Sequence, residues 1–264
     1  MNMPGLLWAH ASSPADLIGR EVHVWCARLD RSPRSLAVLE RLLSADERQR
    51  ASRFHFERDR RRYACARGVL RSLLGEYLGM KPETVAFKYG AHGKPALDAR
   101  AVDAMMFNVS HSEELALFAF ARGIDLGVDV EAVRPVSDAE QIATSFFSPR
   151  EVGRLLALPV ALRQEAFFAC WTMKEAYLKA LGSGLAKPLD AFDVTFAPDE
   201  VARLVVLGDE DETRRWRLQA LAPATGYKAA LVTDGPTTTV RCWAWTDARA
   251  FEEPRQSVLT RGTA

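Results

Sequence analysis

Three acidic residues and one lysine stand at spacings that could place a divalent cation beside a phosphorylated substrate. Asp129 and Glu131 are two positions apart in an apolar run, so in a strand they share a face, with their Cα atoms about 7 Å apart. Glu175 and Lys179 are four positions apart in a helical pattern and share one helix face. Carboxylate oxygens suit Mg²⁺ and an ammonium suits phosphate, so the set predicts a metal-assisted phosphate site.

Each of these signals also has a purely structural explanation. Acids at alternate positions are typical of an edge strand that faces solvent. A Glu followed four residues later by a Lys is a common surface ion pair, worth about 0.3–0.5 kcal/mol. Lys174, which flanks the apolar stripe of the same helix, could extend along it to water. Gly127 lacks a side chain beside the two strand carboxylates, which predicts room for a ligand there.

Composition bounds the class of protein. The chain has 264 residues, 48% of them hydrophobic, enough for one large or two small domains. The net charge of +1 gives no reason to expect nucleic acid or a membrane, and acidic residues interrupt the arginine-rich stretch 58–62. No signal peptide and no apolar stretch of roughly twenty residues occurs, so we expect a cytoplasmic protein. The widely spaced cysteines predict buried, reduced thiols: Cys26, Cys65, Cys170 and Cys242.

Helix signals occur in both halves of the chain. Ser44 and Glu47 form a capping box, and Asp59 is expected to cap a second helix that ends at Gly79. Ser148, Pro149 and Glu151 give another helix start, and this capping role accounts for Glu151 without any function. A long helix is predicted over 164–181.

Strand patterns fill most of the remainder. Residues 115–121 and 124–131 are predicted to form a hairpin through Arg122 and Gly123. Further strands are expected at 21–27, 85–89, 103–110, 192–196, 201–207, 214–221, 227–233 and 238–245. Without βαβ alternation, the pattern predicts an α+β fold with mainly antiparallel sheets. We place a boundary near Gly123, which gives an N-terminal subdomain 1–123 and a C-terminal subdomain 124–264 with a frayed tail from about residue 250.

Six sequence segments in a fixed order carry a family resemblance. In chain order they are the arginine-rich segment 53–71, Gly93-Lys94-Pro95, and residues 108–112 (NVSHS), 127–131 (GVDVE), 146–152 (FFSPREV) and 171–185. Over roughly residues 44–196 the chain closely resembles the broad-specificity, surfactin-synthetase-type 4′-phosphopantetheinyl transferases. The resemblance implies transfer of the phosphopantetheine arm of coenzyme A to a serine of an apo carrier protein. It also implies a pseudo-two-fold pair of similar α+β subdomains with coenzyme A between them, which agrees with the proposed boundary.

The resemblance implies a role for each acidic and basic residue of the opening set. Asp129, Glu131 and Glu175 look like ligands of Mg²⁺, and Lys179 like a phosphate contact. Glu175 also resembles the family's residue that accepts the proton of the carrier serine, directly or through a metal-bound water. Lys174 resembles an active-site lysine of the family.

The resemblance also implies which residues contact coenzyme A. Arg62 and Arg50 match contacts to its 3′-phosphate, and the phosphate, adenine and ribose contacts match Ser110, His111, Gly93, Lys94 and Pro95. A structural hydrogen bond for His111 and an ordinary turn for Gly93–Pro95 are the alternatives. Glu47 stands where some relatives have a lysine, a place that Arg48 could fill.

Two rival functions remain open from sequence: another Mg²⁺-dependent nucleotide phosphotransferase or hydrolase, and a coenzyme A-binding module without catalysis. The three carboxylates together with Lys179 argue against the second. The carrier would be acyl or peptidyl, with candidate contacts at 144–147 and 152–156. We expect a monomer, because both halves of one chain would build the cleft.

Overall fold

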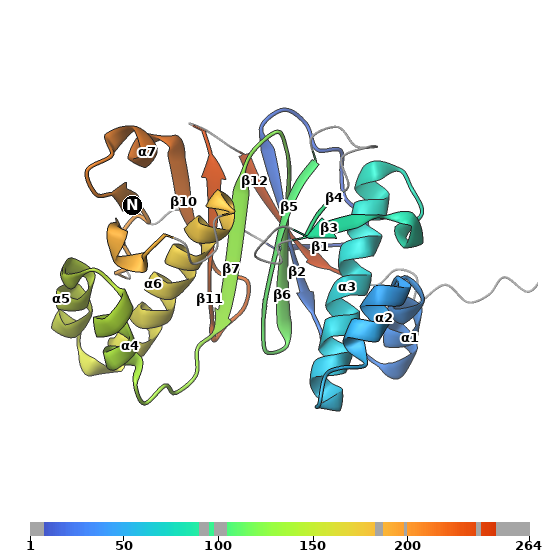
Figure 1. Cartoon of the computed structure of the whole chain (residues 1–264), viewed down its shortest axis with the longest axis horizontal. Coiled ribbons are helices and arrows are strands. Elements are labelled where there is room, and N and C mark those ends of the chain that lie inside the picture. Colours follow the sequence, from blue (N-terminus) through green and yellow to red (C-terminus); the bar gives the residue numbers. More distant parts are fainter. Residues whose placement is uncertain are drawn as a thin grey trace, which may run out of the picture.

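Two β-sheets lie face to face at the centre of the molecule, and helices cover their outer faces (Figure 1). The structure is a computed structural model that describes residues 8–89, 95–97, 105–182, 187–197, 200–235 and 239–246. Helices α1 to α3 cover one sheet, whereas α4 to α6 cover the other (Figure 1). The architecture is therefore four layers: helices, sheet, sheet and helices.

The elements alternate irregularly between helix and strand. The helices are α1 (Pro33–Arg41), α2 (Ala45–Ala51), α3 (Glu57–Leu78), α4 (Ala139–Phe146), α5 (Pro149–Ala157), α6 (Val160–Leu181) and α7 (Glu210–Arg215). The strands are β1 (Ala9–Ala11), β2 (Glu21–Arg28), β3 (Phe87–Tyr89), β4 (Pro95–Leu97), β5 (Met105–Ser112), β6 (Leu115–Arg122), β7 (Leu126–Ala132), β8 (Phe192–Val194), β9 (Leu204–Val206), β10 (Trp216–Leu221), β11 (Tyr227–Asp234) and β12 (Thr239–Trp245).

The larger sheet has five strands in the order β1-β12-β2-β6-β5, and the smaller has three in the order β10-β11-β7. Strands β2, β6 and β5 pair antiparallel, as do all three strands of the smaller sheet. The pairs β1–β12 and β12–β2 are parallel. The predicted α+β class with mainly antiparallel sheets is confirmed.

Three hydrophobic cores separate the layers. The central core lies between the sheets and includes Leu117 and Ala119 of β6 and Val128 and Val130 of β7. A second core joins the other face of the larger sheet to α1 and α3, and a third joins the smaller sheet to α6. Alternation along β7 thus turns its apolar residues toward the larger sheet and leaves Asp129 and Glu131 facing α6.

The predicted hairpin between 115–121 and 124–131 is wrong. Strand β6 pairs with β5 through a turn at Glu113, a non-glycine residue with φ of 49°, whereas β7 pairs with β11. Gly123, with φ of 59°, instead carries the chain from one sheet to the other. The physical reason is that β6 and β7 both bury an apolar face in the central core, so they stack across it rather than pair edge to edge.

The last strand departs from the predicted subdomain limits. Residues 124–264 were assigned to the second subdomain, but β12 lies between β1 and β2 in the first sheet. Its faces contribute to two cores, with Cys242 in the central one and Trp245 in the outer one. A strand that is apolar on both faces is best covered inside the larger sheet.

Smaller differences concern helix ends. Helix α3 begins at Glu57 with Phe56, not Asp59, as its N-cap. Asp59 lies in the first turn, where its negative charge interacts favourably with the helix dipole. Helix α7 replaces the beginning of the strand predicted at 214–221. All four cysteines are buried and free, as expected.

Each half of the chain contains an equivalent buried pair of a capping glutamate and a cation. Glu47, from the capping box of α2, receives a hydrogen bond of 2.6 Å from Arg71 of α3. Glu151, from the capping box of α5, lies 2.7 Å from the Lys174 ammonium of α6. All four side chains are at most 3% exposed. Buried charges persist only when they are paired and hydrogen-bonded, so these pairs tie each long helix to its capped neighbour.

The two pairs also match in their surroundings. Arg71 donates to the carbonyl oxygens of Pro82 and Val85, and Lys174 to those of Leu189 and Phe192, in each case beside a short 3₁₀ turn. Each cation lies eight residues before the glycine that ends its helix in the left-handed conformation, Gly79 or Gly182. This correspondence supports the pseudo-two-fold relation between the halves, although their sequences show no visible repeat.

Lys174, the predicted active-site lysine, is buried and paired in this geometry. The side chain is 0% exposed, and its three N–H groups have three partners within the protein. A substrate could reach it only by breaking the pair with Glu151. These bonds join α6 to α5 and to the backbone beside the second 3₁₀ turn, so we expect Lys174 to act through stability.

Gly127 allows α6 to pack directly on β7. A Cβ atom at this position would lie 2.1 Å from the carbonyl oxygen of Ala176 and 2.4 Å from the amide nitrogen of Ala180. The predicted room for a ligand beside Gly127 is therefore filled by the α6 backbone. This approach is what brings Glu175 and Lys179 to the level of the strand carboxylates.

We expect Gly127→Ala to destabilise the fold, because both clashing atoms belong to a helix backbone that cannot move alone. Overpacking of this kind costs roughly 1–3 kcal/mol or more, measured as the free energy of unfolding in urea. Gly153→Ala is the matched control: its site in α5 is open and helical, so a gain of about 0.5–1 kcal/mol is expected. Equal stability of the two variants would contradict the close packing.

We expect Lys174→Met to lower the free energy of unfolding by about 3–5 kcal/mol, because it leaves Glu151 buried without its partner. Lys88→Met, at an exposed lysine, should change stability little. Adding Glu151→Gln to Lys174→Met should restore part of the loss, since the unpaired charge disappears. A Lys174→Met protein of full stability that has lost only activity would restore the catalytic role.

A carboxylate cluster at the junction of two sheets as candidate active site

Three elements bring the predicted acidic and basic residues together. Strand β7 supplies Asp129 and Glu131, α6 supplies Glu175 and Lys179, and β5 supplies Ser110. The Lys179 ammonium lies 2.6 Å from Asp129 Oδ1 and donates to Ser110 Oγ at 2.9 Å. Ser110 in turn donates to the same carboxylate oxygen at 2.7 Å. The cluster is thus a hydrogen-bonded unit rather than an edge strand with acids in solvent.

The electrostatics of the cluster are dominated by crowding of negative charge. Burial raises the pKa of Glu175, and the neighbouring Asp129 charge adds to the rise while Lys179 opposes it. Burial also raises the pKa of Glu131, against a hydrogen bond of 2.6 Å from Ser112. One ammonium shared among three carboxylates leaves an excess of negative charge, which a divalent cation would relieve.

The donor set fits a hard cation in its chemistry. Asp129 Oδ2 is buried and has no hydrogen-bond partner among the residues described, and no described residue hydrogen-bonds to the Glu175 carboxylate. Carboxylate oxygens of this kind are the protein ligands that Mg²⁺ prefers. Within the described part of the chain, however, no three acidic, histidine or cysteine side chains already form a closed metal site. The three carboxylates are neighbours, and they would have to move closer together to bind one cation.

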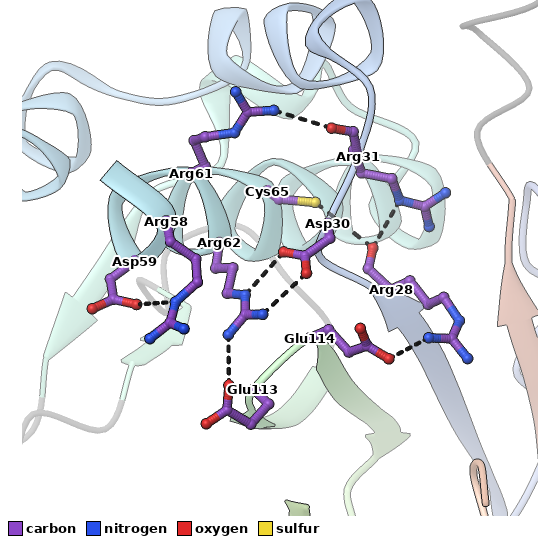
Figure 2. Close-up of polar contacts among 10 residues, drawn as sticks. All are labelled: Arg28, Asp30, Arg31, Arg58, Asp59, Arg61, Arg62, Cys65, Glu113 and Glu114. Atoms are coloured by element: carbon purple, nitrogen blue, oxygen red, sulfur yellow. Dashed lines mark hydrogen bonds and ion pairs between the residues drawn. The ribbon is translucent and has the colours of Figure 1, made fainter. Parts of the chain in front are cut away.

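A second group of charged residues lies at the start of α3 (Figure 2). Arg62 donates two parallel hydrogen bonds to Asp30, of 2.9 and 3.0 Å, and a third of 2.9 Å to Glu113 in the β5–β6 turn. The predicted 3′-phosphate contact is thus held by two carboxylates in this structure. Asp30 binds Nε and Nη2 along one side of the guanidinium, whereas Glu113 binds the remaining nitrogen, Nη1 (Figure 2).

His111 joins the two groups. It lines a hollow of about 210 Å³ together with Arg62, Tyr63 and Glu113. Desolvation and the positive charge of Lys179 lower the pKa of His111, whereas the negative charge of Asp129 acts to raise it. Ser110 and His111, two predicted coenzyme A contacts, are adjacent in β5 and so lie on opposite sides of the strand. Ser110 faces the carboxylates, and His111 faces Arg62.

Other predicted contacts are placed less centrally. The Arg50 guanidinium lies 5.8 Å from the centre of the Tyr63 ring, beside the same hollow, and lines another with Arg53. Glu47 is buried in the pair with Arg71 and does not face a ligand site, whereas Arg48 is exposed and donates to the Leu43 carbonyl. Pro95 lies in β4, whereas Gly93 and Lys94 fall outside the described residues.

Sequence reasoning missed an apolar hollow next to the carboxylates. It has a volume of about 170 Å³ and is lined by Glu131, Arg134, Val136, Ile142, Phe167, Phe168 and Trp171. Its aromatic residues also belong to the core between the smaller sheet and α6 or pack against that core. Only the packing of α4 against α6 shows that these side chains enclose a space that opens beside Glu131.

Among the helices of the described residues, none combines the length and the apolar character that a membrane span needs.

Comparison with known proteins agrees with this geometry. Residues 125–232 match the model of the 4′-phosphopantetheinyl transferase superfamily, and residues 30–122 match that of the 4′-phosphopantetheinyl transferase N-terminal region. The chain is 42% identical over 229 residues to 4′-phosphopantetheinyl transferase HetI of Nostoc sp., covering 86% of this chain and 94% of that protein. It is 30% identical to psf-1 of Bacillus pumilus, over 77% of this chain and 84% of the relative, and 31% identical to Sfp of Bacillus subtilis, over 60% and 68%. The chain belongs to the 4′-phosphopantetheinyl transferase superfamily.

Proposed function

We propose that this chain transfers the 4′-phosphopantetheine arm of coenzyme A to a serine of an apo acyl or peptidyl carrier protein. The observation that carries the proposal is the cluster of Asp129, Glu131, Glu175 and Lys179 between a charged hollow and an apolar one. A different nucleotide phosphotransferase would have no evident use for the apolar hollow beside Glu131. A module that only binds coenzyme A would not need three crowded carboxylates.

The two hollows suggest how coenzyme A would lie. Its 3′-phosphate would meet Arg62, with Arg50 and His111 nearby, and its pyrophosphate would meet Lys179 and Ser110. The uncharged pantetheine arm would continue past Glu131 into the apolar hollow. Pro95, with Gly93 and Lys94, is the proposed contact for adenine and ribose.

The chain's own residues would position the reactants and move one proton. Asp129, Glu131 and Glu175 would hold Mg²⁺, which when bound neutralises charge on the pyrophosphate. The carrier serine oxygen forms a bond to the β-phosphorus, the bond from that phosphorus to the bridging oxygen breaks, and adenosine 3′,5′-bisphosphate leaves. Glu175, whose raised pKa suits a base, would accept the serine proton directly or through water. Lys179 would hold a phosphate oxygen as negative charge moves to the leaving group.

The carrier would dock beside the apolar hollow. Phe146 at the end of α4 and Leu156 in α5 are 51% and 40% exposed, within the predicted contact segments. Phe146 belongs to α4, which helps to enclose the hollow, and Leu156 belongs to the neighbouring α5, so a carrier docked there would present its serine near the hollow. A monomeric, cytoplasmic enzyme remains our expectation.

Incubation of the purified protein with coenzyme A, Mg²⁺ and apo carrier domains tests this function. By intact mass, the carrier should gain one phosphopantetheine arm, and EDTA should abolish the gain because the carboxylates lose their cation. Asp129→Ala should remove turnover with the fold retained, whereas Asp125→Ala, at an exposed acid that precedes the same strand, should not. Folded protein that modifies none of several apo carriers would refute the proposal.

Glu113→Gln should tighten coenzyme A binding about two- to fivefold, because the 3′-phosphate no longer has to displace a carboxylate from Arg62. Calorimetry with coenzyme A and 3′-dephospho-coenzyme A measures the effect, and the dephospho form should show none. Glu114→Gln is the matched control, since Glu114 pairs with Arg28 instead (Figure 2). An equal gain for both ligands would rule out competition for the phosphate site.

A further inference from the structure

Strands β5 and β7 lie side by side at the junction of the two sheets, yet each is an edge strand of its own sheet. Within the described residues, β5 pairs only with β6, and β7 pairs only with β11. The free edge of β7 therefore presents backbone N–H groups that need partners in a buried setting.

Side chains of β5 supply those partners at every second position. The amide of Val128 donates to Asn108 Oδ1 at 2.9 Å, that of Val130 to Ser110 Oγ at 3.3 Å, and that of Ala132 to Ser112 Oγ at 3.1 Å. Each donor lies twenty residues after its acceptor, so one constant register holds along both strands.

The two serines also hold the carboxylates that alternate with those amides. While Ser110 Oγ accepts from β7, it donates to Asp129, and Ser112 Oγ donates to Glu131 Oε2 at 2.6 Å. A hydroxyl has one proton and two lone pairs, so it can do both at once. Alanine could do neither, and the strand amide and the carboxylate would both lose a partner.

We propose that Asn108, Ser110 and Ser112 form a side-chain ladder that replaces backbone pairing between β5 and β7. The ladder fixes the register in which the two halves of the chain meet. Ser112 is within it a positioning residue for Glu131, holding that carboxylate at the mouth of the apolar hollow. The positioning role rests on the proposed function, whereas the ladder itself does not.

Site-resolved amide hydrogen exchange tests the ladder without any assay of activity. In the intact protein the amides of Val128, Val130 and Ala132 should be protected although they lie on a sheet edge. Ser112→Ala should speed exchange at Ala132 by on the order of tenfold, and Ser112→Thr, which keeps the hydroxyl, should not. Ser145→Ala is the matched control, because that hydroxyl bonds within α4. Unchanged exchange at Ala132 in Ser112→Ala would overturn the ladder.

The positioning role is measured as Mg²⁺ affinity. In calorimetry with coenzyme A present, Ser112→Ala should weaken Mg²⁺ binding about 10- to 100-fold, with Ser112→Thr close to the unaltered protein. The Mg²⁺ concentration for half-maximal transfer should rise in parallel, while the affinity for coenzyme A in the charged hollow stays within about twofold. Faster exchange with unaltered Mg²⁺ affinity would overturn the positioning role and leave the ladder standing. Absence of transfer by the unaltered protein would refute the proposed function instead.

Discussion

The contact between α6 and β7 at Gly127 is the constraint on which the candidate site depends. Because position 127 has no side chain, the helix backbone at Ala176 and Ala180 packs directly on the strand. Glu175 and Lys179, on the adjoining turns, then lie at the level of Asp129. A helix held further away, as over an ordinary sheet face, would separate the ammonium from the strand carboxylates. The absence of a side chain at Gly127 thus sets the distance between the charged residues of α6 and those of β7.

Buried ion pairs hold the long helices in the same way in both halves. A glutamate that caps one helix also pairs with a cation of the next, Glu47 with Arg71 and Glu151 with Lys174. Each cation then donates to carbonyl groups beside a 3₁₀ turn. Such pairs add little stability over an apolar core, but losing one partner is costly, so they specify how the helices meet. This shared arrangement relates two halves whose sheets differ in strand number and direction.

The charged side chains of the candidate site do not neutralise one another, whereas those of the two buried ion pairs between the helices do. Lys179 serves Asp129, while Glu131 and Glu175 keep raised pKa values in a partly buried setting. Arg62, in contrast, is paired with two carboxylates, Asp30 and Glu113. Under the proposed function, the excess negative charge at one end would bind the cation, and a phosphate would replace a carboxylate of Arg62 at the other end. A metal-assisted transfer from coenzyme A would use both of these features.

The local sequence determined the periodic elements, the capping boxes and the list of chemically capable residues. Spacing of two in a strand and four in a helix placed the carboxylates and Lys179 on shared faces, because those periods follow from backbone geometry alone. Only the tertiary structure decided which faces met: that β6 and β7 stack rather than pair, that β12 joins the first sheet, and that Lys174 is buried while Lys179 is not. These outcomes depend on contacts between residues far apart in the chain, such as Asn108 with Val128 or Lys174 with Phe192. Local patterns carry no record of such partners, so the apolar hollow and the side-chain ladder appeared only in the folded molecule.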